Sequence, residues 1–134
     1  MNQKILMEKL EAHQIPVSLQ RIHILSFLFE NPGHYRAEEV YETLKPKVPT
    51  LSKSTVYNTL HLFSEKGLLR TLSLEEGVTH YDAMMEDHAH FICEQCHQIT
   101  NVPLQEALPQ IDLPGTQIHQ KDLIYRGICQ KCLV

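Results

Sequence analysis

The stretch from His88 to Cys96, with the sequence His-Ala-His-Phe-Ile-Cys-Glu-Gln-Cys, carries two kinds of metal ligand at two different spacings. Its central residues are apolar and permit a strand, in which His88 and His90 point to the same face. Cys93 is an odd number of residues from both histidines and starts on the opposite face. The spacing therefore predicts two separate ions, one bound by imidazoles and one bound by thiolates.

The four cysteines form two Cys-x-x-Cys pairs, Cys93 with Cys96 and Cys129 with Cys132. Two such pairs from distant segments supply four thiolates, which suit a closed tetrahedral zinc site. The alternatives are two disulfides or a redox-active pair. Disulfides are disfavoured without a secretory context, and a redox motif would not be duplicated near the C-terminus. We therefore expect a structural zinc ion.

The length and composition suit a small soluble protein. A chain of 134 residues that is 43% hydrophobic forms one ordinary domain or two small ones. Residues 1–10 lack the continuous apolar core of a signal peptide, and the longest apolar run, around residues 24–29, is too short to span a bilayer. We expect a cytoplasmic protein with no membrane partner.

The charge distribution limits how this chain could bind nucleic acid. The formal net charge is −4 and the pI is about 6.1, which by itself argues against such a partner. Residues 1–84 hold nine of the twelve Lys and Arg residues against ten acidic ones, whereas residues 85–134 hold three against six. Any contact with DNA must therefore depend on a local cluster of basic and polar groups in the first part.

Apolar periodicity and capping residues in the first part predict four helices and a hairpin. The helices are expected at residues 2–13, from Ser18 as N-cap to residue 31, at 36–44, and from Ser52 or Ser54 to Lys66; the strands at 68–74 and 78–83, joined by residues 75–77. Short helices followed by a hairpin predict a winged helix-turn-helix, whose last helix enters the major groove of DNA. A helical bundle with an added hairpin is the alternative.

The fourth predicted helix has two distinct sides. Val56, Leu60 and Phe63 recur at helical spacing and form a stripe that we expect to be buried. The opposite side presents side chains that can form hydrogen bonds, namely Ser54, Tyr57, Asn58 and His61. Candidate phosphate contacts are Arg21, Lys53 and Arg70. In the second part, strands are expected at residues 89–93, 98–102 and 117–125, with a short helix over 104–108 between Pro103 and Pro109.

With these elements in this order, the chain resembles the ferric-uptake-regulator (Fur) family of bacterial metal-dependent repressors over nearly its whole length. The motif Ser54-Thr55-Val56-Tyr57-Asn58-Thr59-Leu60 resembles the recognition helix of that family, and the stretch from His88 to Cys96 resembles its metal-binding core. The resemblance implies an α+β chain. A winged helix-turn-helix DNA-binding domain would occupy residues 1–83, and a small α/β dimerisation domain with the four-cysteine zinc site would occupy residues 84–134. The expected DNA contacts are Arg21, Lys53, Ser54, Thr55, Tyr57 and Asn58.

The same resemblance implies a regulatory metal site made of His34, Asp82, His88, His90 and Asn101. Asn101 stands where the family usually has a carboxylate, and its amide oxygen is a neutral and weaker ligand for a hard divalent ion. Imidazole and carboxylate ligands without a thiolate suit Fe²⁺ or Mn²⁺. Aspartate at position 82 is typical of the peroxide-sensing branch of the family.

The resulting hypothesis is a metal-dependent repressor that binds palindromic operator DNA as a homodimer and is not an enzyme. It would sense peroxide through iron-catalysed oxidation of a ligand histidine, first His34 and then His90, and would take no small-molecule substrate. An iron- or manganese-responsive repressor without peroxide sensing is the alternative within the family. From other classes, His88, His90 and Asp82 could form the facial triad of a metalloenzyme, or the zinc-binding part could be a protein-interaction adapter.

Overall fold

The protein forms two compact units, Met1–Met85 and Glu86–Val134. The computed structural model describes residues 2–75, 77–83 and 87–134. The domain boundary predicted from sequence, between residues 83 and 84, adjoins residues 84–86, which lie outside the described residues. No helix in the described part of the chain is long and apolar enough to cross a membrane.

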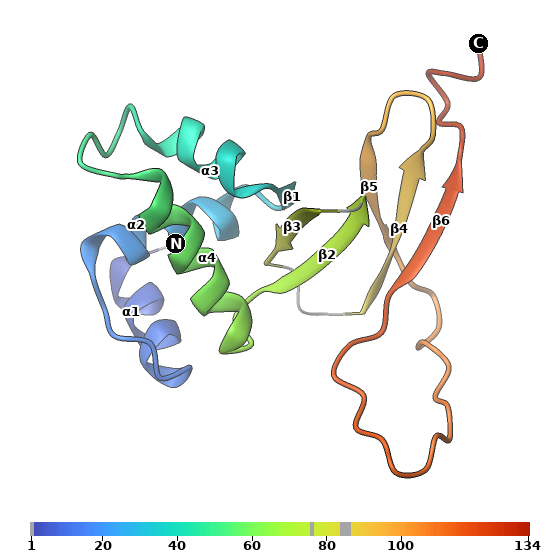
Figure 1. Ribbon diagram of the computed structural model, residues 1–134, viewed down its shortest axis with the longest axis horizontal. Helices are drawn as coiled ribbons and strands as arrows, with labels where there is room; N and C mark the ends of the chain where they lie inside the picture. The colour runs from blue at the N-terminus through green and yellow to red at the C-terminus, as the bar shows by residue number, and fades with distance from the viewer. Residues whose placement is uncertain (1, 76, 84–86) are drawn as a thin grey trace. The chain divides into compact units, whose positions relative to one another are not determined.

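The described residues of the first unit form four helices and a small sheet, which Figure 1 labels. The helices carry the buried core, and the three strands form an antiparallel sheet in the order β1-β3-β2. The elements are α1 (Gln3–Ala12), α2 (Leu19–Glu30), β1 (His34–Tyr35), α3 (Ala37–Leu44), α4 (Lys53–Glu65), β2 (Arg70–Glu75) and β3 (Val78–Asp82). Helices α3 and α4 with the β2–β3 hairpin form the winged helix-turn-helix that the sequence predicts.

Side-chain caps determine where the helices of this unit begin. Ser18 accepts a hydrogen bond from the backbone N–H of Arg21 at 3.2 Å, as predicted, so α2 begins at the next residue. Ser52 accepts from the backbone N–H of Thr55 at 3.1 Å, which identifies Ser52 rather than Ser54 as the cap of α4. Gly67, with φ of 79°, follows α4 in the left-handed conformation that commonly terminates helices.

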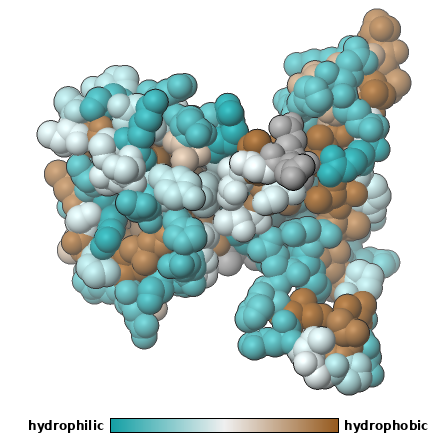
Figure 2. All heavy atoms as spheres, in the orientation of Figure 1, coloured by the Kyte–Doolittle hydropathy of each residue, from teal (hydrophilic) through white to brown (hydrophobic). Residues whose placement is uncertain are grey.

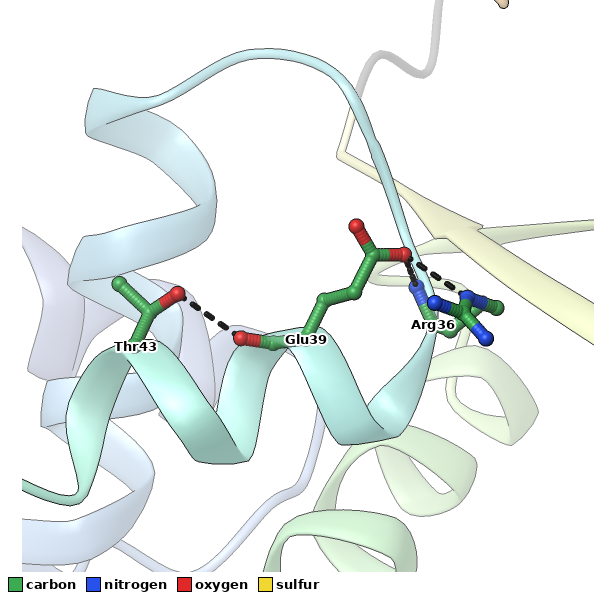
Figure 3. Close-up of polar contacts among 3 residues, drawn as sticks. All are labelled: Arg36, Glu39 and Thr43. Carbon is green, nitrogen blue, oxygen red and sulfur yellow. Dashed lines mark hydrogen bonds and ion pairs between the residues drawn. The ribbon is translucent and has the colours of Figure 1, made fainter. Parts of the chain in front are cut away.

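The start of helix α3 is stabilised by hydrogen bonds from Arg36 to the side chain of Glu39 (Figure 3). The backbone N–H and the side-chain Nε of Arg36 both donate to Oε1 of Glu39, each at 3.1 Å. One turn later, Oγ1 of Thr43 donates to the carbonyl oxygen of Glu39 at 2.8 Å. The carboxylate of Glu39 therefore has a structural role, in which it satisfies a helix-end donor and neutralises an adjacent arginine.

The core of the first unit confirms the apolar stripe predicted on α4. Val56, Leu60 and Phe63 are completely buried. They pack with apolar residues from α1, α2 and α3 and with Leu68, Leu69 and Tyr81. This core fixes which side of α4 faces inward, so the polar side of the helix remains exposed.

Lys45 stabilises the turn between α3 and α4. Its Nζ donates to the carbonyl oxygens of Pro49 and Leu51, at 2.7 and 2.8 Å. The same ammonium lies 5.8 Å from the centroid of the Tyr41 ring, a distance at which a cation is attracted to the ring face. The turn thus depends on one cation that satisfies two backbone acceptors.

Strand β1 was not predicted from the sequence. Its two residues pair with the central strand β3, His34 with Asp82 and Tyr35 with Tyr81. A strand of two residues leaves no periodic pattern, so neither propensity nor alternation could identify it. The predicted hairpin connection at residues 75–77 includes Glu76, which lies outside the described residues.

The described residues of the second unit form a three-stranded sheet and a long loop over residues 104–122, both drawn in Figure 1. The strands are β4 (His88–Cys93), β5 (Ile99–Pro103) and β6 (Leu123–Gly127), in the order β5-β4-β6, and β4 is antiparallel to β5 but parallel to β6. The α+β class expected for the chain is confirmed. The helix predicted at residues 104–108 is wrong, because this segment is irregular. A helix of five residues between two prolines would form too few backbone hydrogen bonds to offset the free-energy cost of helix nucleation.

The strand predicted at residues 117–125 is also shorter than expected, because β6 begins only at Leu123. The preceding residues belong to the loop over 104–122, which exposes Ile111, Leu113 and Ile118. Figure 2 shows hydrophobic atoms at the surface of this loop. Alternating apolar residues there resembled a strand although they have no partner strand, so the pattern alone misplaced the boundary by six residues.

Replacing Lys45 by methionine should destabilise the first unit by about 2 kcal/mol, since hydrogen bonds to a charged group contribute about 1.5–3 kcal/mol each and part of the loss is offset by the retained apolar stem. Chemical denaturation followed by circular dichroism measures this change. Lys47→Met, an exposed position two residues further on, is the matched control and should change the free energy of unfolding by less than about 0.5 kcal/mol. Equal losses for both variants would contradict the role of Lys45.

Candidate functional site

The sheet of the second unit brings the two cysteine pairs together. Cys93 ends β4 and is the register partner of Gly127, which ends the parallel strand β6. Because parallel neighbours end at the same edge of a sheet, the segments that follow them emerge side by side. The backbone N–H of Glu94 also donates to the carbonyl oxygen of Gly127 at 2.7 Å. The two Cys-x-x-Cys pairs therefore meet although 32 residues separate Cys96 from Cys129.

The geometry of the four sulfur atoms fits a tetrahedral zinc ion. The sulfurs of Cys93, Cys96, Cys129 and Cys132 lie within 4.8 Å of one another, and all four are free thiols. Zinc–sulfur bonds of about 2.3 Å at tetrahedral angles would place the sulfurs about 3.8 Å apart. The distance between Sγ of Cys96 and Sγ of Cys129 is 3.8 Å. This cluster matches a closed structural site rather than two disulfides.

Hydrogen bonds prepare one of these thiols for metal binding. The backbone N–H groups of Cys96 and Cys129 each donate to Sγ of Cys93 at 3.4 Å, and they lower the pKa of Cys93 to about 6. The neighbouring sulfur of Cys129, together with burial, raises the pKa of Cys132 to about 12. At neutral pH Cys93 is therefore already a thiolate, whereas Cys132 must release a proton when a metal binds. Metal affinity should accordingly rise with pH.

In the first unit, His34 and Asp82 form a pair of potential metal ligands. They face each other on the adjacent strands β1 and β3, with Nδ1 of His34 3.6 Å from Oδ2 of Asp82. Their side chains are only 5% and 3% exposed. Two ligand atoms bound to one ion through bonds of about 2.1 Å lie about 3.0–3.5 Å apart, so this spacing is close to that of a shared metal.

In the second unit, His88 and His90 lie on the same face of β4, as predicted from their spacing. Both are buried, and their ring centroids are 4.5 Å apart in an edge-to-face arrangement. Asn101 on β5 is the register partner of His90. Residues directly opposite in an antiparallel pair have Cβ atoms about 4.5–5.5 Å apart. The amide of Asn101 could therefore reach a metal ion that is bound by His90.

Four of the six predicted DNA contacts gather at one surface of the first unit. Lys53, Ser54, Tyr57 and Asn58 line a hollow of about 290 Å³ between α3 and α4. The ring of Tyr57 is 57% exposed and lies parallel to that of His61, with centroids 6.4 Å apart. An exposed aromatic ring beside hydrogen-bonding side chains on the polar side of a helix suits contact with base edges.

The other two predicted contacts have local roles. Oγ1 of Thr55 lies 2.8 Å from Oγ of Ser52, within the cap of α4. Nη1 of Arg21 donates to the carbonyl oxygen of Pro16 at 2.6 Å, which holds the segment that leads into α2. Neither residue lines the hollow beside Tyr57.

Comparison with known proteins bears on the whole chain. The model of the ferric uptake regulator family matches residues 12–123. The chain belongs to the ferric uptake regulator family. Membership confirms the resemblance noted in the sequence and disfavours the metalloenzyme and adapter hypotheses, because the family consists of transcriptional regulators.

Individual relatives carry informative names. The chain is 32% identical over 130 residues to the peroxide operon regulator of Bacillus subtilis, covering 94% of this chain and 90% of the relative. It is similar in structure to the peroxide-sensing regulator PerR from Streptococcus pyogenes, with a TM-score of 0.54 and 25% identity over 97% of this chain and 92% of that one. It also shares the fold of the ferric uptake regulator from Pseudomonas aeruginosa with manganese, with a TM-score of 0.72 and 20% identity over 94% and 98% of the two chains.

A second hollow on this ferric uptake regulator family member was not foreseen from the sequence. It measures about 210 Å³ and lies where α3 begins, beside Tyr57 and strand β3. Glu38 and Tyr57 line both hollows, and Tyr81 lines the second. Burial raises the pKa of Tyr81, and nearby Tyr57 and Glu38 raise it further. Glu38 lies in the first turn of α3, where carboxylates are common, so its place in the sequence does not distinguish it.

Replacing Cys96 by serine should abolish tight zinc binding and unfold the second unit, because binding of a structural zinc ion contributes roughly 10–16 kcal/mol to folding. Zinc content by mass spectrometry and protease sensitivity of residues 86–134 measure the two effects. Gln95→Ser, at an exposed position in the same turn, is the matched control and should retain the metal. A Cys96→Ser protein with unchanged zinc content and protease resistance would show that the cluster is not a structural zinc site.

Proposed function

We propose that this protein is a metal-dependent transcriptional repressor that binds palindromic operator DNA as a cytoplasmic homodimer. The observation that carries the proposal is that one chain of this family combines an exposed polar side of α4 with two sets of potential metal ligands. The relatives named as peroxide regulators support the same conclusion. In a dimer, two copies of α4 would meet successive major grooves, so the operator should be a palindrome with half-sites about one helical turn apart.

The regulatory ion is proposed to be Fe²⁺ or Mn²⁺, held by His34 and Asp82 from the first unit and by His88, His90 and Asn101 from the second. Two lines of support are the donor set, which contains imidazole and oxygen but no thiolate, and the pairing of ligands within each unit. An ion that binds both sets would favour one arrangement of the two units, and its loss would release that arrangement. Operator affinity would then depend on metal occupancy.

If the proposed ligands bind Fe²⁺, the site could sense hydrogen peroxide. Bound Fe²⁺ would supply the electron that reductively cleaves hydrogen peroxide, and the damage would fall on the side chains that hold it. The imidazole of His34 is the first expected target, with His90 next. Oxidation of His34 would remove one of the two ligands that the first unit provides, so the protein should release its operator.

A repressor that responds to iron or manganese without sensing peroxide is the second candidate. Asn101 favours it, since the residue opposite His90 offers a neutral amide instead of a carboxylate. A neutral ligand lowers the affinity for a hard divalent cation. Low occupancy by iron would leave the imidazoles undamaged when peroxide is added.

Protein loaded with Fe²⁺ without oxygen should lose operator binding after peroxide is added, because a ligand histidine is oxidised. Peptide mass spectrometry should locate the added oxygen at His34. The Mn²⁺-loaded protein is the control and should bind the operator before and after treatment, since Mn²⁺ reacts slowly with peroxide. Oxidation confined to methionine residues, with operator binding intact in the iron-loaded protein, would favour the repressor that does not sense peroxide.

Tyr57→Ala should lower discrimination between operator and random DNA by about 1–3 kcal/mol, the cost of one lost base contact. Arg21→Ala is expected to weaken binding to every sequence alike, as loss of a phosphate contact does. Fluorescence anisotropy with operator and scrambled duplexes at one salt concentration separates the two patterns. The assignment of Tyr57 fails if its variant loses the same factor on both duplexes.

A further inference from the structure

Two hollows flank Tyr57, and the carboxylate-bearing residue Glu38 belongs to both. The smaller hollow lies between the start of α3 and strand β3, and the larger lies between α3 and α4. The residues common to the two are Ala37, Glu38 and Tyr57. Any group that enters either hollow beside the Tyr57 ring therefore meets Glu38.

Glu38 and its neighbour Glu39 are used differently. The carboxylate of Glu39 accepts from the backbone and from Nε of Arg36 at 3.1 Å (Figure 3). Glu38 is exposed and forms no hydrogen bond or ion pair with another residue that the structure describes. The charge of Arg36 is thus matched by Glu39, and the charge of Glu38 is not matched within the described part of the chain.

Lys53, which also lines the larger hollow, forms no ion pair with Glu38. Its Nζ lies 5.7 Å from the centroid of the Tyr41 ring, and Nζ of Lys45 lies 5.8 Å from the same centroid. The Glu38 carboxylate therefore keeps its acceptor positions available to a group that enters either hollow beside Tyr57. A carboxylate repels a phosphate group and attracts a hydrogen-bond donor.

The surface that contains these hollows is the one proposed to meet the major groove. Only two kinds of donor are presented there by the bases, the exocyclic amino groups N4 of cytosine and N6 of adenine. A carboxylate accepts from N4 of cytosine, whereas adenine presents an adjacent acceptor, N7, that a carboxylate repels. The chemistry of Glu38 thus selects cytosine.

We propose that Glu38 is a specificity-determining residue, whose carboxylate accepts a hydrogen bond from N4 of a cytosine beside the base that Tyr57 contacts. The inference rests on the proposed function, because it requires α3 and α4 to meet operator DNA. It adds a base contact from the helix that precedes the recognition helix. It also explains why an acidic residue stands at a DNA-binding surface of a protein whose net charge is already negative.

The test begins with duplexes that the wild-type, Mn²⁺-loaded protein selects from a random-sequence pool. Each base pair of one half-site is then changed in turn, and dissociation constants are measured at one salt concentration. Glu38→Ala should lose about tenfold discrimination at one C·G pair, as expected for loss of one base contact. Glu38→Gln should shift the preference at that pair towards A·T, since an amide can pair with both N6 and N7 of adenine.

Glu42→Ala is the matched control, because Glu42 is an exposed acidic residue one turn along α3 and lines neither hollow. It should change affinity for all duplexes by one small factor and leave every base preference intact. If both Glu38 variants behave like Glu42→Ala, Glu38 acts only as a charge and the inference is overturned. A wild-type protein that selects no sequence would instead overturn the proposed function, and the inference with it.

Discussion

The second unit depends on the meeting of four thiols at one edge of its sheet. Its buried apolar side chains in the described residues are few, namely Ala89, Ile92, Cys93 and Leu108, which is less than an independent core requires. The loop over residues 104–122 adds length without regular structure. The cysteine cluster lies at the other edge of the sheet from this loop, where it joins the end of β4 to the chain that follows β6. The position of the two histidines on β4 therefore depends on the cysteine cluster at the end of the same strand.

Much of this architecture could be predicted from the sequence, because it depends on local chemistry. The stripe of Val56, Leu60 and Phe63 predicted the inward side of α4, and Ser18 and Ser52 acted as the caps that their types suggest. The meeting of the cysteine pairs followed from ligand chemistry alone. Strand β1 could not be predicted, since two residues carry no period. The loop was misread because apolar spacing indicates a strand only when a neighbouring strand is present to pair with it.

Some residues of the candidate sites could be predicted from local spacing, and others could not. Ligands two residues apart, such as His88 and His90, have a spacing that reveals a shared face. The pairing of His34 with Asp82 depends on the register between β1 and β3 and leaves no local pattern. Glu38 has the same difficulty, since its place beside Tyr57 results from how α3 packs against α4 and the wing. The spacing of residues along one helix or strand predicts which of them share a face. Contacts between different elements depend on how the elements pack, so they followed only from the resemblance to a family or from the structure.

The alternation of side chains along β3 limits where residues can be inserted into or deleted from the β2–β3 hairpin. Asp82 faces His34, while the preceding residue, Tyr81, points to the opposite face and lines a hollow beside Tyr57. Removing one residue from the hairpin and shifting β3 by one position would exchange these faces. Tyr81 would then face His34, and the carboxylate of Asp82 would stand beside Tyr57. Insertions and deletions should therefore be tolerated only where the ladder is already irregular, between Leu72 and Glu75, and natural variants of the wing should differ in length there.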